Sequence, residues 1–330
     1  MNEMKKLIFL ITVALILTGC SGDEDEEVNE KVATFATVIQ TPTNLGGLNS
    51  EYDDYNSTLD ENREMGIIFS SNRNSQGNDF DLIYKYLVIK EDPENKNITI
   101  EYPDYDVPYY WKNIFRNVNS AENEFGPYLN SAGENLFLMY STKNNAGYDI
   151  QFLNLTDFGS AQFDTFDSIP KTIPKINEYD DDLYPTFSTD KKNLIFCSNK
   201  NSNVFNIYNT LFKTEINFES LINGDIESIN KIESLSSIAD DKCPYIGVND
   251  MMVFTSNREG GFGGYDIWYS FYVNGQWIAP KNFGSEINTG QDEFRPITFK
   301  MFERNFMIFS SNRPGGKGGF DLYFAEFKTE

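Results

Sequence analysis

The stretch that decides the fold reads Met307-Ile308-Phe309-Ser310-Ser311-Asn312-Arg313, followed after a glycine-rich loop by Phe320-Asp321-Leu322-Tyr323. An apolar strand runs into a polar corner, and a second strand begins with an aromatic residue and Asp. The same order recurs in residues 67–84, 138–150, 194–208 and 252–269. A strand-forming unit that returns about every sixty residues predicts a repeat architecture.

Polar residues recur at the corner and at the start of the strand that follows it. We expect them to be structural, because five equivalent sites rarely serve one catalytic centre. The acids among them should accept hydrogen bonds from backbone N–H groups of the corner or pair with its arginines. These positions are Asn72, Arg73, Asp81, Asp149, Asn199, Asn206, Asn257, Arg258, Asp266, Asn312, Arg313 and Asp321.

An acidic turn and a short strand precede each corner, and a longer excursion with a fourth strand follows it. Four antiparallel strands per unit, repeated radially, predict an all-β protein, a β-propeller of five four-stranded blades. Residues 35–42 resemble the fourth strand at residues 276–280, so they should complete the last blade and close the ring. The long segment 85–121 has room for a degenerate sixth blade.

The corner followed by Asp-Ile/Leu and an aromatic residue resembles the TolB-type propeller repeat, a relative of WD repeats, over most of residues 33–330. The resemblance implies protein–protein contacts at the cell envelope. The usual Pro-Asp-Gly turn of that family, between the first two strands of a blade, is missing from this chain.

The N-terminus has the pattern of an export signal. Lys5 and Lys6 precede a short apolar run that ends in Leu17-Thr18-Gly19-Cys20. This tetrad resembles the lipobox of bacterial lipoproteins, which implies that residues 1–19 are removed and that Cys20 is lipidated. The alternative is an ordinary secretory signal with a chance Cys. Lipidation would anchor the protein to a membrane through acyl chains alone.

Residues 20–32 form an acidic tether that contains the run Asp23-Glu24-Asp25-Glu26-Glu27. The run resembles the export tag that follows the lipidated Cys in surface lipoproteins of some Gram-negative bacteria. It implies an outer-membrane protein whose propeller, residues 33–330, lies at the cell surface. A plain linker and the periplasmic face of the membrane are the alternatives.

The net charge is −23 and the chain has no His. This balance argues against a nucleic-acid partner, and it rules out Ser-His-Asp triads, Cys-His pairs and His-ligated metals. Carboxylate chemistry and oxygen-ligated cations are left. Cys197 and Cys243 fall in adjacent repeats, so they can form a disulfide or remain two buried free thiols.

The acidic turns should gather near one mouth of the propeller channel. We expect this candidate face to bind a cation such as calcium, or a basic partner, because converging carboxylates need a counter-charge. The alternative is that each acid caps its own turn or pairs with a neighbouring blade. No other cofactor is expected. The acids are Asp53, Asp54, Glu122, Glu124, Asp181, Asp182, Asp240, Asp241, Asp292 and Glu293.

Two functions are compatible with these patterns. The first, which we prefer from the sequence, is a lipid-anchored, non-enzymatic binding or scaffold module whose partner is an envelope or surface protein or a glycan. The alternative is a glycoside-active enzyme of the five-bladed type, with carboxylates in the central funnel as acid and base. Equivalent acids in equivalent repeats argue against the enzyme, because catalysis needs carboxylates in unlike surroundings.

Overall fold

Five antiparallel sheets form the body of the computed structural model, which describes residues 35–60, 66–144, 147–156, 169–177, 181–200 and 202–330. The first sheet has three strands, β3 (Asp54–Asp60), β4 (Gly66–Ser71) and β5 (Asp81–Tyr86). The next three have four strands each. They are β8 (Glu124–Ala132), β9 (Asn135–Lys143), β10 (Tyr148–Asn154) and β11 (Lys171–Thr172); β12 (Asp182–Phe187), β13 (Asn193–Ser198), β14 (Asn206–Phe212) and β15 (Ile226–Lys231); and β16 (Asp241–Ile246), β17 (Met252–Ser256), β18 (Asp266–Ser270) and β21 (Lys281–Asn282).

The fifth sheet joins the two ends of the propeller. It contains β22 (Glu293–Met301), β23 (Arg304–Ser311), β24 (Asp321–Thr329), β1 (Ala36–Val38) and β2 (Thr43–Asn44). Strand β1 pairs antiparallel with β24, Ala36 opposite Thr329 and Val38 opposite Phe327. The predicted closure of the ring by the N-terminal strand is therefore confirmed, and it pairs an edge that would otherwise be open.

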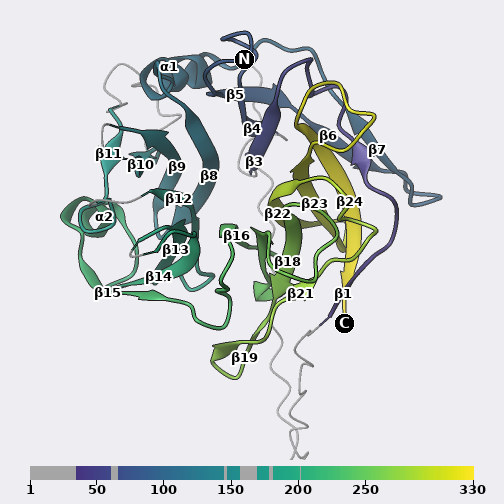
Figure 1. Cartoon of the computed structure of the whole chain (residues 1–330). Helices are drawn as coiled ribbons and strands as arrows, with labels where there is room; N and C mark the ends of the chain where they lie inside the picture. Colours follow the sequence, from purple (N-terminus) through teal and green to yellow (C-terminus); the bar gives the residue numbers. More distant parts are fainter. Residues whose placement is uncertain (1–34, 61–65, 145–146, 157–168, 178–180, 201) are drawn as a thin grey trace, which may run out of the picture. The chain divides into compact units, whose positions relative to one another are not determined.

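The five sheets are arranged around one axis (Figure 1). Their innermost strands are β3, β8, β12, β16 and β22; each contacts the next, and β22 contacts β3. The predicted five-bladed propeller is thus confirmed. The segment 85–121 does not form a sixth blade: it holds the hairpin of β6 (Val88–Glu91) with β7 (Ile98–Glu101) and the helix α1 (Tyr109–Val118).

Apolar strands bury both of their faces because each blade is packed between two others. In β23, Phe306 and Ile308 face a cluster shared with the first blade, whereas Met307 and Phe309 face a cluster shared with the fourth. Successive side chains of a strand point to opposite faces. An unbroken apolar run such as residues 306–309 is therefore what a blade requires.

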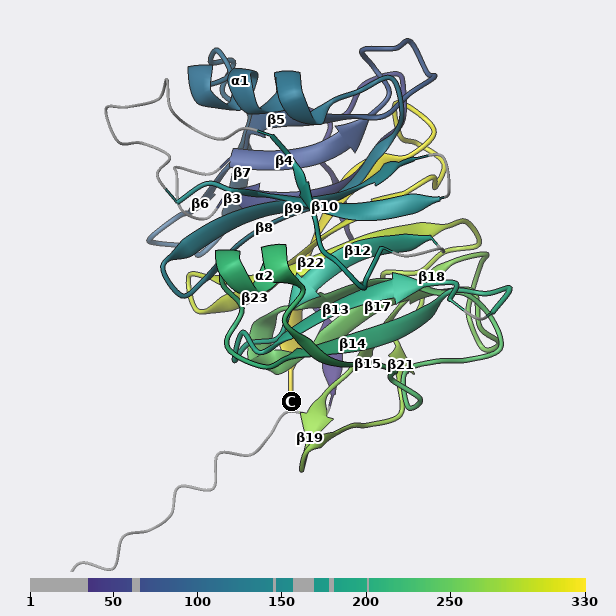
Figure 2. The same cartoon turned by 90° about the vertical axis from the view of Figure 1, so that its left-hand side faces the viewer.

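The helices lie outside the sheets (Figures 1 and 2). Helix α1 buries Trp111, Ile114 and Val118 against the first and second blades. No fourth strand pairs with β5 among the described residues, so the first blade departs from the predicted four strands. Helix α2 (Phe218–Asn223) begins with a capping box of Asn217 and Ser220 and ends at Gly224, whose φ of +58° terminates it.

Candidate functional site

One acid of each predicted pair is buried at the start of an innermost strand. In three blades the corner arginine binds it: Arg73 contacts Asp54 at 2.5 Å, Arg313 contacts Glu293 at 3.0 Å, and Arg258 contacts Asp241. All five acids are at most 2% exposed, and they are Asp54, Glu124, Asp182, Asp241 and Glu293. These carboxylates lie inside the blades and are not presented on a face.

The second blade has no corner arginine. Asn144 stands at the position of the corner arginine, and Glu124 accepts hydrogen bonds from the hydroxyls of Ser120 at 2.6 Å and Thr142 at 3.1 Å. Burial raises the pKa of Glu124 to about 7, although these hydrogen bonds oppose the rise. The carboxyl group of Glu124 therefore changes its protonation near neutral pH.

The acid that precedes each buried one joins two blades. Asp53 accepts the backbone N–H of Phe320 at 2.7 Å, and Asp292 accepts that of Tyr265 at 2.8 Å. Asp181 and Asp240 do the same for Tyr148 and Phe205. In the second blade Asn123 takes this role, and the predicted Glu122 is exposed beside it.

The asparagine of each full corner binds this acidic turn within its own blade. The Oδ1 atoms of Asn72, Asn199, Asn257 and Asn312 accept the backbone N–H groups of Asp53, Asp181, Asp240 and Asp292 at 2.8–2.9 Å. This geometry corresponds to the alternative given for the acidic turns, in which the acids form contacts within their own turn and with a neighbouring blade. No group of three or more His, Cys, Asp or Glu residues could hold a metal ion in the part of the chain that the structure describes.

The acids at the start of the third strand bind backbone, but they are not the partners of the corner arginines. Asp321 accepts the N–H groups of Lys317 at 2.6 Å and Gly318 at 3.2 Å, together with the amide of Asn44 at 2.8 Å. Asp266 has the same set of contacts in the fourth blade. Their expected pairing with Arg258 and Arg313 is replaced by that of Asp241 and Glu293, because the arginines turn toward the innermost strand.

The remaining members of this set are more weakly bound. Asp81 accepts the amide of Asn74 at 2.9 Å, and Asp149 is bound by the amide of Asn144. Asn206 is buried, and its amide donates to the carbonyl of Val204 at 3.2 Å.

A single arginine occupies the axis of the propeller. Arg295 lies on β22 of the fifth blade, is 0% exposed, and donates to the carbonyls of Pro244 in the fourth blade and Pro127 in the second. Its guanidinium also lies over the rings of Tyr184 and Tyr245. A side chain that reaches three other blades must cross the centre, so no open funnel exists at this level.

Five equivalent residues of the innermost strands, Arg295 among them, share the same unusual backbone conformation near the axis. Each follows the buried acid by two positions, interrupts the strand register and has a φ between +44° and +59°; they are Asn56, Gly126, Tyr184, Cys243 and Arg295. A Cβ on Gly126 would lie 2.3 Å from the Tyr184 ring. The glycine therefore makes room for the tyrosine on which Arg295 lies.

Both cysteines of the described residues are free and buried. Cys197 and Cys243 share one apolar cluster with Leu183 and Tyr184. Burial raises the pKa of the Cys243 thiol to about 12 and that of Cys197 well above its ordinary value. Neither thiol is a nucleophile at neutral pH.

A groove of about 700 Å³ lies between the third and fourth blades. It is at the opposite end of the strands from the corners: the turn Ser188–Asp190 follows β12, and Asp250 lies in η2 (Val248–Asp250) after β16. The hairpin of β19 (Tyr272–Val273) with β20 (Gln276–Trp277) closes it from the fourth blade. A volume of this size suits a small-molecule or oligomeric ligand.

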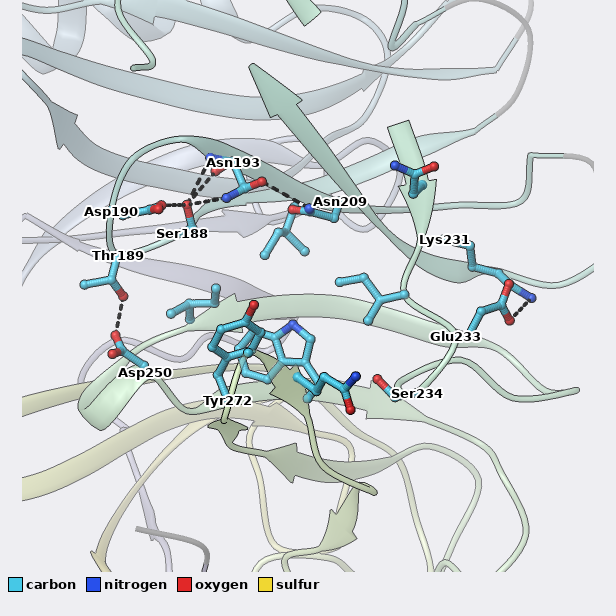
Figure 3. Close-up of a pocket in the computed structure, with 17 residues that line it drawn as sticks. Ser188, Thr189, Asp190, Asn193, Asn209, Lys231, Glu233, Ser234, Asp250 and Tyr272 are labelled. Carbon is cyan, nitrogen blue, oxygen red and sulfur yellow. Dashed lines mark hydrogen bonds and ion pairs between the residues drawn. The ribbon is translucent and has the colours of Figure 1, made fainter. Parts of the chain in front are cut away.

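Aromatic and carboxylate groups meet in this groove (Figure 3). Tyr272 and Trp277 are cross-strand neighbours with ring centroids 5.0 Å apart, and Tyr272 is 49% exposed. In Figure 3 Tyr272 lies between two polar groups, with Asp190 and Asp250 on one side and Glu233 on the other.

The carboxylates of the groove have unlike surroundings. Burial alone would raise the pKa of Asp190, but hydrogen bonds from the Ser188 hydroxyl at 2.6 Å and the Lys192 N–H at 3.1 Å, with the Lys192 charge, hold it below its ordinary value. Asp250 accepts the hydroxyl of Thr189 from the neighbouring blade. Glu233 pairs with Lys231 at 2.7 Å.

The prediction from sequence missed the groove, because its residues do not recur. One local signal pointed to part of it: Asn274 and Gly275, with φ of +51° and +80°, form the turn that presents Tyr272 and Trp277. An Asn-Gly pair between two short strands is a strong signal of a hairpin.

Residues 4–21 match the model of the prokaryotic membrane lipoprotein lipid attachment site. The protein is therefore a membrane-anchored lipoprotein, as the N-terminal pattern predicted. The predicted lipid site, Cys20, and the acidic tether lie outside the described residues. Among the described residues, no helix has the length and apolarity needed to cross a bilayer. A search of curated protein sequences gives no match.

Several solved structures resemble the chain. A thermostable family-43 glycoside hydrolase has a TM-score of 0.49 and 11% identity, over 84% of this chain and 92% of its own. The α-L-arabinofuranosidase PaAbf62A from Podospora anserina, in complex with cellotriose, has 0.47 and 12% over 90% and 96%. The α-L-arabinanase of Cellvibrio cellulosa, complexed with arabinohexaose, has 0.47 and 9% over 84% and 92%.

These structures are glycoside-active enzymes, and this finding contradicts the predicted non-enzymatic binding module. That prediction, with its expected lack of enzymatic activity, is not retained. At identities of 9–12% and TM-scores of 0.47–0.49, the likeness assigns no role to this chain, and the propeller fold rests on its own strand pairing. The substrates of those enzymes are therefore not assigned to this chain.

Proposed function

We propose that this lipoprotein is a carboxylate-dependent, glycoside-active enzyme that holds a glycan in the groove between its third and fourth blades. The observation that carries the proposal is the exposed ring of Tyr272 opposite the carboxylates of Asp190 and Asp250. An aromatic face packs against the C–H face of a sugar ring, and carboxylates accept its hydroxyl groups. Because Arg295 fills the axis of the propeller, the candidate site is the groove and not a central funnel.

Glycoside hydrolysis uses two carboxyl groups in different roles, one as acid and one as base or nucleophile. Asp190 suits the second role, because its lowered pKa keeps it ionised. Asp250 is the second carboxyl group of the pair, since it lies on the neighbouring blade and accepts the hydroxyl of Thr189. Unlike surroundings for two carboxyl groups are what such a division of roles requires.

The test is sugar release from a panel of polysaccharides and aryl glycosides by the purified propeller. Asp190→Asn and Asp250→Asn should each lower the rate about a hundredfold or more while the melting temperature is kept. Asp79→Asn, in an exposed loop at the other end of the strands, is the matched control and should keep full activity. Absence of sugar release by the wild type on every substrate would end the proposal, as would full activity in both groove variants.

Three finer expectations remain proposals. The acidic run after Cys20 supports an outer-membrane lipoprotein with its propeller at the cell surface, and protease treatment of intact cells tests this placement. The five corner repeats support membership of the TolB-type family. A calcium ion at the acidic turns would be tested by calorimetric titration, in which a lack of heat down to millimolar affinity would exclude it.

A further inference from the structure

We infer that the ligand of the groove is a neutral glycan chain with one sugar ring stacked on Tyr272, and that uronic-acid polymers are excluded. This inference rests on the proposed function for the location of the ligand, but not for its hydrolysis. It is carried by three features of the groove: an exposed aromatic platform, a wall of amide groups and an excess of negative charge.

The aromatic platform consists of Tyr272 and Trp277, and it is packed against the protein on one side and exposed to solvent on the other. Trp277 packs against the apolar cluster between the third and fourth blades, and its neighbour Tyr272 stays 49% exposed. The turn at Asn274 and Gly275 has the left-handed backbone that fits a tight two-residue hairpin, which places the Tyr272 and Trp277 rings side by side. A ring presented in this way can accept the face of a pyranose.

The opposite wall carries amide groups. Asn209 donates from Nδ2 to Oδ1 of Asn193 at 3.1 Å, and Asn193 contacts the Ser188 hydroxyl at 3.4 Å. The amide of Asn209 therefore has its orientation set by the protein. Its Oδ1 atom is a hydrogen-bond acceptor, and amides of this kind suit hydroxyl groups, which both donate and accept.

The charge of the groove selects against anions. Asp190, Glu233 and Asp250 line it, and the one cation among the lining residues, Lys231, is paired with Glu233 at 2.7 Å, which leaves the two aspartates in excess. The whole chain adds a net charge of −23. A carboxylated sugar would meet like charge at close range without a free cation among these lining residues. A neutral chain pays no such penalty.

A cationic amino sugar is the competing ligand. Because the groove is open to solvent, charge changes affinity only modestly in either direction, by about tenfold. The stacking surface and amide wall therefore decide in favour of a neutral chain, and the amino sugar becomes an outcome of the test.

The experiment measures binding of cellohexaose, xylohexaose, mannohexaose, hexagalacturonate and chitosan hexamer to the propeller by calorimetry at physiological salt. At least one neutral hexamer should bind, and hexagalacturonate should bind at least tenfold more weakly. Tyr272→Ala should weaken that binding by tenfold or more, and Tyr272→Phe should keep it. Tyr109→Ala, an equally drastic change at an exposed position on α1, should leave it unchanged.

Tight binding of hexagalacturonate, tighter binding of the chitosan hexamer, or full affinity in Tyr272→Ala would overturn the inference. The two proposals fail separately. Neutral binding that depends on Tyr272 without sugar release contradicts the proposed activity and leaves the ligand class standing. Sugar release that is unaffected by Tyr272→Ala contradicts the stacking on Tyr272 and leaves the proposed activity standing.

Discussion

Arg295 of the fifth blade donates from its guanidinium to the carbonyl of Pro127 in the second blade, at 3.3 Å across the axis of the propeller. The two residues are far apart in the sequence and lie on opposite sides of the ring. The burial of Arg295 lowers its pKa, while the thiol of Cys243 and the neighbouring tyrosines oppose the shift. The centre of this propeller is therefore a polar contact between blades.

Replacing Arg295 by Ala should destabilise the fold by about 3 kcal/mol, because the change leaves a cavity and two carbonyls without their donors. Arg295→Met should cost less than half as much, since it fills much of the space and removes a buried charge. Urea unfolding of both variants measures the difference. Equal stability of the Ala variant and the wild type would show that the axial contact is not needed.

The corner ion pairs should contribute more to the free energy of unfolding than surface ion pairs do. Arg258→Ala leaves Asp241, which is 0% exposed, as an unpaired buried charge, and the expected loss is about 3 kcal/mol. Lys300→Ala breaks an exposed pair with Glu303 and should leave the free energy of unfolding close to that of the wild type. Denaturant unfolding at pH 7 compares them, and similar losses in the two variants would contradict the structural role of the corner.

Glu124 should make stability depend on pH. Its pKa is raised from 4.5 to about 7 in the folded protein, so the folded state binds the proton more tightly than the unfolded one. Its contribution is fully present below pH 4.5 and is lost as the pH rises through 7. The total is about 3 kcal/mol, from 1.36 kcal/mol per unit of pKa.

The variant Glu124→Gln should remove this contribution to the pH dependence and leave the rest of the curve. Asn144 stands where three other blades carry the corner arginine, so Asn144→Arg should stabilise the protein at pH 8 by giving Glu124 an ionic partner. Melting temperatures between pH 4.5 and 8.5 provide the test. Parallel curves for the wild type and Glu124→Gln would exclude the assignment.

Asp321 should matter far more than Asp149, although they hold the same position in the repeat. Asp321 is 1% exposed and accepts hydrogen bonds from two backbone N–H groups and from Asn44 of the closing segment. Asp321→Ala should lower stability by about 2 kcal/mol. Asp149→Ala, which loses the amide of Asn144, should cost below about 1 kcal/mol; the reverse order would contradict the observed contacts.

The amino-acid sequence by itself determined the fold of this protein. Apolar runs such as residues 306–309 bury both faces, and the corners after them recur five times, so the number of blades can be counted along the chain. The closing strand was predictable for the same reason, because residues 35–42 copy a strand that occurs later. A repeated strand pattern can be recognised along the sequence without knowing which segments meet in space.

Only the tertiary structure decided which polar groups meet. The sequence places an acid and an arginine at each full corner, but it does not show that Arg258 turns toward Asp241 and away from Asp266. Nor does it bring Asp190 of the third blade, Asp250 and Tyr272 into one groove. Such contacts join segments that the sequence keeps apart, and their geometry is set by how neighbouring blades pack.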